Sequence, residues 1–325
     1  RTARTAHELT GSKNLTLAGG VALNCVANGR ILREGPFENV WIQPAAGDAG
    51  GALGAALFVW HQLLDNPRTT GEFDSQFGSF LGEQESAESI TKYLDSVGAV
   101  YQKFSEEENL CDRVAELLAD ENVIGHVGGR MEFGPRALGA RSILGDARSP
   151  RMQEVMNVKI KFRESFRPFA PAVLKDRVDE YFEMRPEEES PYMLLVAPVK
   201  KDKLINAESS GEKGLDQLKQ LRSVVPAITH VDNSARVQTI DEARNPRFHG
   251  ILKKFEERTG SPVLINTSFN VRGEPIVRTS EDAYRCFMHT NMDVLVLEDF
   301  VLLKDDQPDA REIDLEAYLT EFALD

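Results

Sequence analysis

The sequence predicts an α/β protein, and three observations carry this prediction. Short apolar strands, glycine-containing turns and helices alternate along most of the chain. Hydrophobic residues make up 41% of the 325 residues, which suffices for at least one well-buried core. The longest apolar runs, residues 294–297 and 300–303, fall far short of a membrane span, so no membrane partner is predicted.

The chain opens with two repeats of strand, turn and helix. A strand over residues 15–18 leads through Gly19 and Gly20 into a helix over residues 21–33. The second repeat covers residues 40–64 and has its own glycine-rich turn. The strands that should precede these repeats in a sheet are not seen, so we expect the chain to begin inside a domain.

A polar stretch at residues 66–88 predicts a domain boundary, which we place between units 1–80 and 81–325. Ser280 is the expected N-cap of a helix that begins there. The other elements predicted for the second unit are helices over residues 106–120, 246–259 and 280–289, a loop with a surface helix over 202–220, and strands over 123–127, 159–163, 193–197, 263–266, 293–298 and 300–303.

The charge distribution excludes some partners and suggests another. A formal net charge of −14 argues against broad nucleic-acid or anionic-membrane binding. Three cysteines without a CxxC spacing predict reduced thiols and a cytoplasmic protein. Between Arg130 and Arg167, however, nine basic residues face only four acidic ones. This basic segment is either paired with acids elsewhere or forms a pocket for a small polyanion such as nucleotide phosphates.

A glycine-rich segment over residues 128–139 directly follows a predicted strand. Pro135 and Arg136 stand where a P-loop needs Lys-Ser/Thr, so this is not a Walker A motif. Glycine-rich backbone close to Arg130, Arg136 and Arg141 nevertheless suits an anion, because guanidinium groups bind phosphate or carboxylate oxygens in pairs. A purely structural turn is the less favoured interpretation.

Two further segments carry polar side chains at alternating positions. On a strand, Lys159, Lys161 and Arg163 would share one face, which an anion would stabilise; a solvated edge strand is the alternative. Ser268 and Asn270 follow an apolar strand and would also share a face, from which they can hydrogen-bond phosphate or sugar.

The two N-terminal turns give weaker signals. Glycines at Gly19 and Gly20 would let the backbone approach a ligand at a helix N-terminus, although an ordinary tight turn has the same sequence. Asp48 is either a metal ligand or the N-cap of the following helix. The six histidines show no HxxxH spacing, so the sequence predicts no histidine metal site.

These motifs together resemble the NodU/CmcH-type O-carbamoyltransferases, and the resemblance covers nearly the whole chain. The matching stretches are residues 17–24, 47–50, 129–139, 162–171 and 266–270. The resemblance implies that residues 1–80 are the end of an actin-like (ASKHA) carbamoyl-transfer domain. It implies that residues 81–325 are a YrdC-like domain with a twisted mixed sheet, which makes carbamoyl-adenylate from carbamoyl phosphate and ATP.

The resemblance also implies roles for individual residues. Lys161, Arg163 and Arg136 would act in catalysis, and Asp48 would match a metal ligand. Nucleotide-side contacts would come from Arg130, Arg141, Ser268, Asn270, Gly19 and Gly20.

The same resemblance implies cofactors and partners. Mg²⁺ would accompany ATP, and the intact transfer domain would hold a divalent metal, with iron as one candidate; we expect no tightly bound metal here. The acceptor would be a hydroxyl-bearing small molecule, and the first half of the transfer domain is the expected missing partner. A threonylcarbamoyl-adenylate synthase and a non-catalytic nucleotide- or RNA-binding module are the alternatives.

Overall fold

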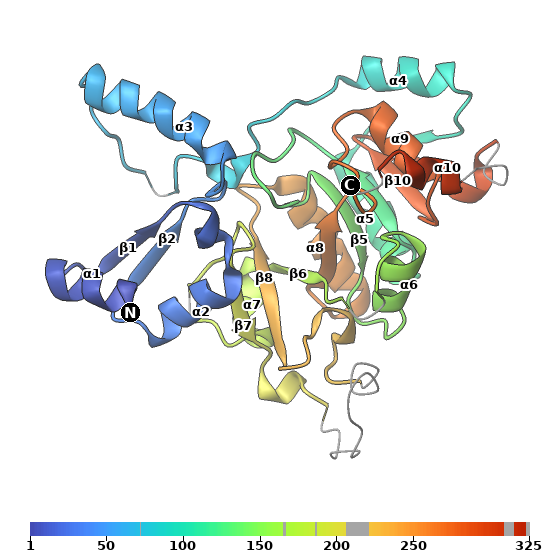
Figure 1. The fold of residues 1–325 in the computed structure, drawn as a ribbon. Coiled ribbons are helices and arrows are strands. Elements are labelled where there is room, and N and C mark those ends of the chain that lie inside the picture. Colours follow the sequence, from blue (N-terminus) through green and yellow to red (C-terminus); the bar gives the residue numbers. More distant parts are fainter. Residues whose placement is uncertain (72, 165–166, 186, 206–220, 309–314, 323–325) are drawn as a thin grey trace.

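The computed structural model describes residues 1–325 except 72, 165–166, 186, 206–220, 309–314 and 323–325. Most of the loop and surface helix predicted at residues 202–220 therefore lies outside the described residues. A two-stranded sheet near the N-terminus lies beside a nine-stranded sheet, which contains all the later strands that the structure describes (Figure 1). The two predicted repeats of strand, turn and helix are confirmed in the smaller sheet.

The N-terminal part contains α1 (Thr2–Thr10), β1 (Asn14–Leu17), a 3₁₀ turn (Gly20–Leu23), α2 (Cys25–Glu34), β2 (Asn39–Ile42), α3 (Ala49–Phe58) and a π-helical continuation (Val59–Leu63). β1 and β2 pair in parallel, with Leu15 opposite Val40. The Asn24 side chain accepts a hydrogen bond from the Ala27 amide and thereby caps α2.

The large sheet has the strand order β3-β11-β10-β4-β5-β9-β6-β8-β7. Its strands are β3 (Gln102–Lys103), β4 (Ile124–Val127), β5 (Arg141–Asp146), β6 (Ala170–Leu174), β7 (Leu195–Pro198), β8 (Ser234–Ile240), β9 (Val263–Ser268), β10 (Val294–Leu297) and β11 (Phe300–Leu303). The β10–β4 and β6–β8 pairs are parallel and the others are antiparallel, so the prediction of an α/β fold is confirmed as one with a mixed sheet.

Helices cover both faces of this sheet. The longer ones are α4 (Ala87–Ser96), α5 (Glu107–Ala119), α6 (Met152–Lys159), α8 (Pro246–Thr259) and α9 (Ser280–Met288), and short ones are α7 (Val178–Tyr181) and α10 (Leu315–Thr320). α5 and α8 bury one face with Val294 and Val296, while α4, α6 and α9 bury the other with Leu295 and Leu297. Alternate residues of one strand thus enter opposite cores.

Two of the predicted elements were wrong. Residues 159–163 are not a strand, because Met152, Met156 and Ile160 recur every four residues and are all buried, which is helical spacing. The helix ends at Lys159, and Phe162 has a left-handed φ of 47°. The N-cap of α9 is Thr279, not Ser280; its side chain and that of Asp282 form a reciprocal capping box.

The edge strand β7 is covered by helix α2, and this contact joins the two sheets. Asn28 Nδ2 lies 3.1 Å from the Leu194 carbonyl oxygen, and Arg33 Nη1 lies 2.6 Å from that of Val196. Gly29 makes the approach possible, because a Cβ atom there would lie 2.4 Å from the Val196 oxygen. Side-chain donors of α2 thereby protect carbonyl groups at the edge of the sheet.

We therefore expect Gly29→Ala to weaken the packing of the N-terminal part. The added methyl group must push α2 from β7, and overpacking of this kind costs roughly 1–3 kcal/mol of unfolding free energy. Gly51→Ala is the matched control, because Gly51 lies on a helix with nothing within 4 Å of its Cβ position, and alanine should stabilise it slightly. Urea unfolding followed by circular dichroism compares the two; equal stability of both variants would contradict this account of the contact.

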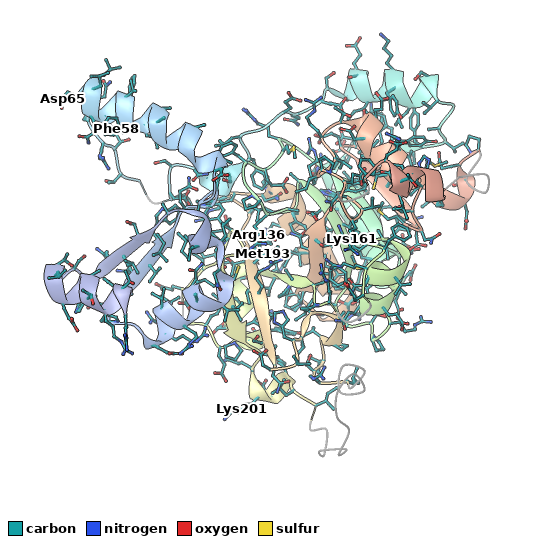
Figure 2. The ribbon with its side chains drawn as sticks, in the orientation of Figure 1. Phe58, Asp65, Arg136, Lys161, Met193 and Lys201 are labelled. Carbon is teal, nitrogen blue, oxygen red and sulfur yellow. The ribbon has the colours of Figure 1, made fainter. Side chains whose placement is uncertain are left out.

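Helix α3 and its continuation project away from the body of the protein, as the labels of Phe58 and Asp65 in Figure 2 show. Phe58 is 66% exposed, Trp60 52% and Leu63 73%. This projecting helix therefore exposes several large apolar side chains. In the described part of the chain, no helix combines the length and the apolar character that crossing a membrane requires.

Candidate functional site

A row of basic side chains runs from the C-terminal end of α6 to the junction with the N-terminal part. Lys161 and Arg163 follow α6, Arg236 comes from β8, and Arg136 lies in the loop before β5. Burial is the main reason why the pKa values of Lys161, Arg163 and Arg236 are lowered. Repulsion by a neighbour in the row lowers each of them further. This neighbour is Arg163 for Lys161, Arg236 for Arg163 and Arg136 for Arg236. Like charges held this close favour an anion between them.

The end of the row near the N-terminal part leaves hydrogen-bond donors unused. Arg136 Nη2 lies 3.3 Å from the Leu23 carbonyl oxygen and 3.5 Å from Cys25 Sγ. The Nε atoms of Arg136 and Arg236 are buried and have no hydrogen-bond partner among the residues that the structure describes. Figure 2 shows Arg136 beside Met193, whose carbonyl oxygen is 3.5 Å from Cys25 Sγ. Buried N–H groups without acceptors are costly, so this is where a ligand oxygen is best accommodated.

Arg163 is held in place by two neighbours. Its Nε donates to Asn157 Oδ1 at 2.6 Å, and its guanidinium carbon lies 4.9 Å from the centre of the Phe169 ring. Burial first, and then the charges of Arg167 and Arg236, lower its pKa to about 10. The planar guanidinium group is thus oriented by stacking, while its two terminal nitrogens stay available for paired contacts to an oxyanion.

Lys161 links the basic row to the segment after β9. Its side chain is 4% exposed, and its Nζ lies 2.7 Å from the Asn270 carbonyl oxygen and 2.8 Å from Asn270 Oδ1. A further short hydrogen bond reaches the Ser268 carbonyl oxygen, and Ser268 Oγ donates to Asn270 Oδ1 at 2.7 Å. Burial lowers the pKa of Lys161 to about 7. The structure therefore brings Lys161 together with Ser268 and Asn270, and Arg163 follows two residues along the chain.

The sequence analysis missed Glu132, which shapes the glycine-rich loop. Its buried Oε1 accepts hydrogen bonds from the amides of Leu138 and Ala140, both at 2.7 Å, and of Arg141 at 3.1 Å. A carboxylate that gathers three amides fixes a loop far better than glycines alone. A lone acid inside a basic, glycine-rich segment was the signal that pointed to it.

Arg141 and Arg130 lie apart from the basic row. The buried guanidinium group of Arg141 donates to the carbonyl oxygens of Gly129, Ala140, Glu83 and Arg278 at 3.0–3.3 Å. That of Arg130 is exposed and donates to the carbonyl oxygens of residues 81 and 82. Both side chains fasten the loop to its neighbours, and the anion contacts predicted for them find no geometric support.

The N-terminal candidates are exposed. Gly19, with a φ of 95°, and Gly20 begin the 3₁₀ turn that ends at Leu23, whose carbonyl oxygen accepts from Arg136. Asp48 stands at the N-cap position of α3 but its side chain makes no capping bond. Within the described residues, no three His, Cys, Asp or Glu side chains are grouped as metal ligands. A lone exposed carboxylate does not fit a tightly bound metal.

The largest omission of the sequence analysis is Arg236. It is a single arginine in a strand whose other residues are buried, with the exposure pattern buried-buried-intermediate-buried across Ser234 to Val237. No motif surrounds it, so no local signal distinguished it from an edge residue. Its role emerges only when β8 is placed beside the loop that holds Arg136.

Comparison with known proteins gives two family matches. The family described as "Carbamoyltransferase C-terminus" matches residues 115–304, and that described as "Carbamoyltransferase N-terminus" matches residues 1–57. An uncharacterized protein of Synechocystis is 57% identical over all of this chain and 53% of its own length. The nodulation protein NolNO of Sinorhizobium fredii is 40% identical over 91% of this chain and 41% of its own length.

The chain thus spans about half the length of the curated relatives it matches. Among solved structures, full-length HypF in its phosphate- and nucleotide-bound form aligns with 62% of this chain and 22% of its own. The TM-score is 0.38 at 16% identity, a likeness too weak to carry any argument.

Proposed function

Because this chain belongs to the carbamoyltransferase family, we propose that residues 81–325 activate a carbamoyl group with ATP for transfer to a hydroxyl group. The observation that carries this proposal is the row of Lys161, Arg163, Arg236 and Arg136, which includes two buried Nε–H groups without acceptors. A triphosphate or carbamoyl phosphate supplies several oxygens at once, which such a row of donors needs.

The proposed reaction forms carbamoyl-adenylate in two balanced steps. Water first cleaves carbamoyl phosphate to carbamate and inorganic phosphate. A carbamate oxygen then attacks the α-phosphorus of ATP, and the bond to the β-phosphate oxygen breaks, releasing pyrophosphate. Carbamate alone is a poor acyl donor, and the adenylate gives it a good leaving group.

The basic row would act on the charge of this second step. Negative charge grows on the departing pyrophosphate, and pre-positioned guanidinium donors in a half-buried site stabilise it without reorganisation. Each such contact contributes roughly 2–4 kcal/mol to lowering the barrier. We assign this role to Arg136, Arg163 and Arg236. Asn270, whose Nδ2 donates one of its two hydrogens to Glu274, would contact the nucleotide phosphates from the other side. Lys161 and Ser268, whose polar hydrogens are donated within this cluster, would hold Asn270 in position.

Mg²⁺ would enter with ATP. With no ready-made cluster of acidic ligands in the described residues, phosphate oxygens and water would supply most of its coordination, as Mg²⁺ usually prefers. Its contribution when bound would be to neutralise phosphate charge. Asp48 does not fit the second, tightly bound metal implied for the transfer domain, and we derive no step from it.

We propose that the carbamoyl group is transferred in an actin-like domain, and that residues 1–80 form the end of this domain. The acceptor would be a hydroxyl-bearing small molecule. A sugar or a secondary metabolite is the proposed class of acceptor.

Pyrophosphate release from ATP and Mg²⁺, with and without carbamoyl phosphate, tests this proposal. We expect release that depends on carbamoyl phosphate and falls on the order of 100-fold in Lys161→Ala, because the side chain that holds Asn270 beside the phosphates is lost. Release that depends on threonine and bicarbonate instead would indicate a threonylcarbamoyl-adenylate synthase. ATP binding without any release would contradict catalysis by this chain.

A further inference from the structure

The C-terminal helix α10 contacts a buried carboxylate behind the candidate site. Tyr318 is 2% exposed, and its ring stacks on that of His289 with 4.4 Å between the ring centres. Its hydroxyl group donates to Glu274 Oε1 at 2.5 Å. A buried phenol paired with a carboxylate is a strong, charge-assisted contact. It ties the end of the chain to the segment that follows β9.

Glu274 in turn fixes the backbone of that segment. Its Oε2 accepts from the Val271 amide at 2.7 Å and lies 3.4 Å from Cys286 Sγ, while its carbonyl oxygen accepts from Asn270 Nδ2 at 2.7 Å. Glu274 therefore stabilises the turn at residues 270–274 through both its side chain and its backbone carbonyl group. The turn carries Asn270 at its start.

Asn270 passes this restraint into the candidate site. While its Nδ2 is held by Glu274, its Oδ1 accepts from Lys161 Nζ at 2.8 Å and from Ser268 Oγ at 2.7 Å. The path from Tyr318 to Lys161 thus runs through Glu274 and Asn270, by contacts of 2.5–2.8 Å. An amide with both ends engaged has one orientation.

A backbone contact supports the same coupling. Gly273 has a φ of 86°, and a Cβ atom there would lie 2.2 Å from the Phe322 carbonyl oxygen, so the turn and the end of α10 meet without side chains between them. On the outer side, Arg285 of α9 pairs with Glu321 at 2.5 Å and covers the Tyr318 ring. The residues that follow α10 are therefore anchored at two points, Glu321 and Phe322.

We propose that Tyr318 is a positioning residue that, through Glu274, holds Ser268 and Asn270 in place for nucleotide phosphates; this rests on the function proposed above. Tyr318 itself stays away from the reacting atoms. Its hydroxyl determines how rigidly the turn at residues 268–274 holds Asn270 in position.

Tyr318→Phe in the full chain tests the proposal, because it removes one oxygen and keeps the ring that stacks on His289. Losing a hydrogen bond to a charged group loosens the turn, so ATP affinity, measured by calorimetry with ATP and Mg²⁺, should fall about tenfold. Amide hydrogen exchange of residues 268–274 should become faster, Val271 included. In turnover, the KM for ATP should rise more than kcat falls.

Tyr101→Phe is the matched control. Tyr101 Oη also donates to a carboxylate, that of Asp95 at 2.8 Å, but on the surface and away from the turn at residues 268–274. It should leave ATP affinity and exchange in that turn unchanged. A double-mutant cycle adds Asn270→Ala, in which the effect of Tyr318→Phe on ATP affinity should vanish, because the restraint acts through Asn270.

Unchanged exchange at residues 268–274 in Tyr318→Phe would overturn the proposal, and so would faster exchange with unaltered ATP affinity. Additive effects in the cycle would also overturn it, since they would make Tyr318 a general stabiliser. If the wild-type chain released no pyrophosphate but bound ATP, the catalytic proposal would fail alone. Binding and exchange would then still decide the role of Tyr318.

Discussion

Replacing Arg236 by methionine should lower the affinity for ATP and the rate of pyrophosphate release on the order of 100-fold without lowering the stability of the fold. The loss of binding follows from the proposed function, in which this guanidinium group, with its buried Nε lacking a partner among the described residues, would make charge-assisted contacts to phosphate. The stability should be equal or higher, because Arg236 is desolvated and repels Arg136, and its favourable partner among the described residues is the Cys25 thiol rather than a carboxylate.

Arg244→Met gives the contrasting result that makes this prediction sharp. Arg244 is also buried, but it pairs with Glu189 at 2.7 Å and with Asp241 at 2.6 Å, and these partners raise its pKa. Its removal takes the salt bridge from Asp241 and leaves Glu189 with Lys175 alone, and should lower the thermal midpoint strongly. Thermal unfolding without ligand and calorimetry with ATP measure both halves. A lower midpoint in Arg236→Met, like that of Arg244→Met, would show that the arginine row is structural.

Lys161→Met should flatten the dependence of stability on pH. Burial holds the pKa of Lys161 near 7 in the folded chain, against 10.5 for an ordinary lysine. Between these values the unfolded chain binds more protons, so the lysine makes the free energy of unfolding rise with pH. Between pH 7 and 9 the wild-type chain should gain about 2 kcal/mol relative to the variant. Urea unfolding at the two pH values measures this difference.

Lys304→Met is the control for this experiment. Lys304 is also buried, with a pKa lowered to about 8, but it donates to the carbonyl oxygens of Met288 and Thr290 behind α9. Its loss should flatten the pH dependence less and leave pyrophosphate release unchanged, whereas Lys161→Met should abolish release. A wild-type stability that falls from pH 7 to 9 relative to Lys161→Met would show that the three oxygens around Nζ keep it charged.

The candidate site was predictable where its residues lie in short motifs. Lys161 and Arg163, and likewise Ser268 and Asn270, are two positions apart, so the motifs identified them even though the strand assigned to the first pair was wrong. Arg236 was not predictable, because its function depends on β8 lying beside a loop 100 residues earlier in the chain. Arg141 was predicted to bind an anion because it lies close to glycines in the sequence. That proximity could not show that its guanidinium group already donates to backbone carbonyl oxygens.

The elements themselves followed from periodicity and turn residues, while their order in the sheet did not. Helix α8, with Pro246 at its start and Gly260 at its end, lies where it was predicted. The placement of β9 between β5 and β6 rests on long-range pairing that no local pattern encodes. The same holds for α2, whose docking on β7 depends on Gly29 and on a strand some 165 residues away.

The exposed helix that follows α3 has a spectroscopic consequence. The chain has two tryptophans, Trp41 and Trp60, both in its first 60 residues, and 38% and 52% of their surfaces face solvent. Excited at the red edge of the absorption band, the protein therefore emits from its N-terminal part alone. Any molecule that covers this helix will shift that emission toward the blue, and no added label is needed to see it. Events confined to the far side of the nine-stranded sheet will leave the emission spectrum unchanged.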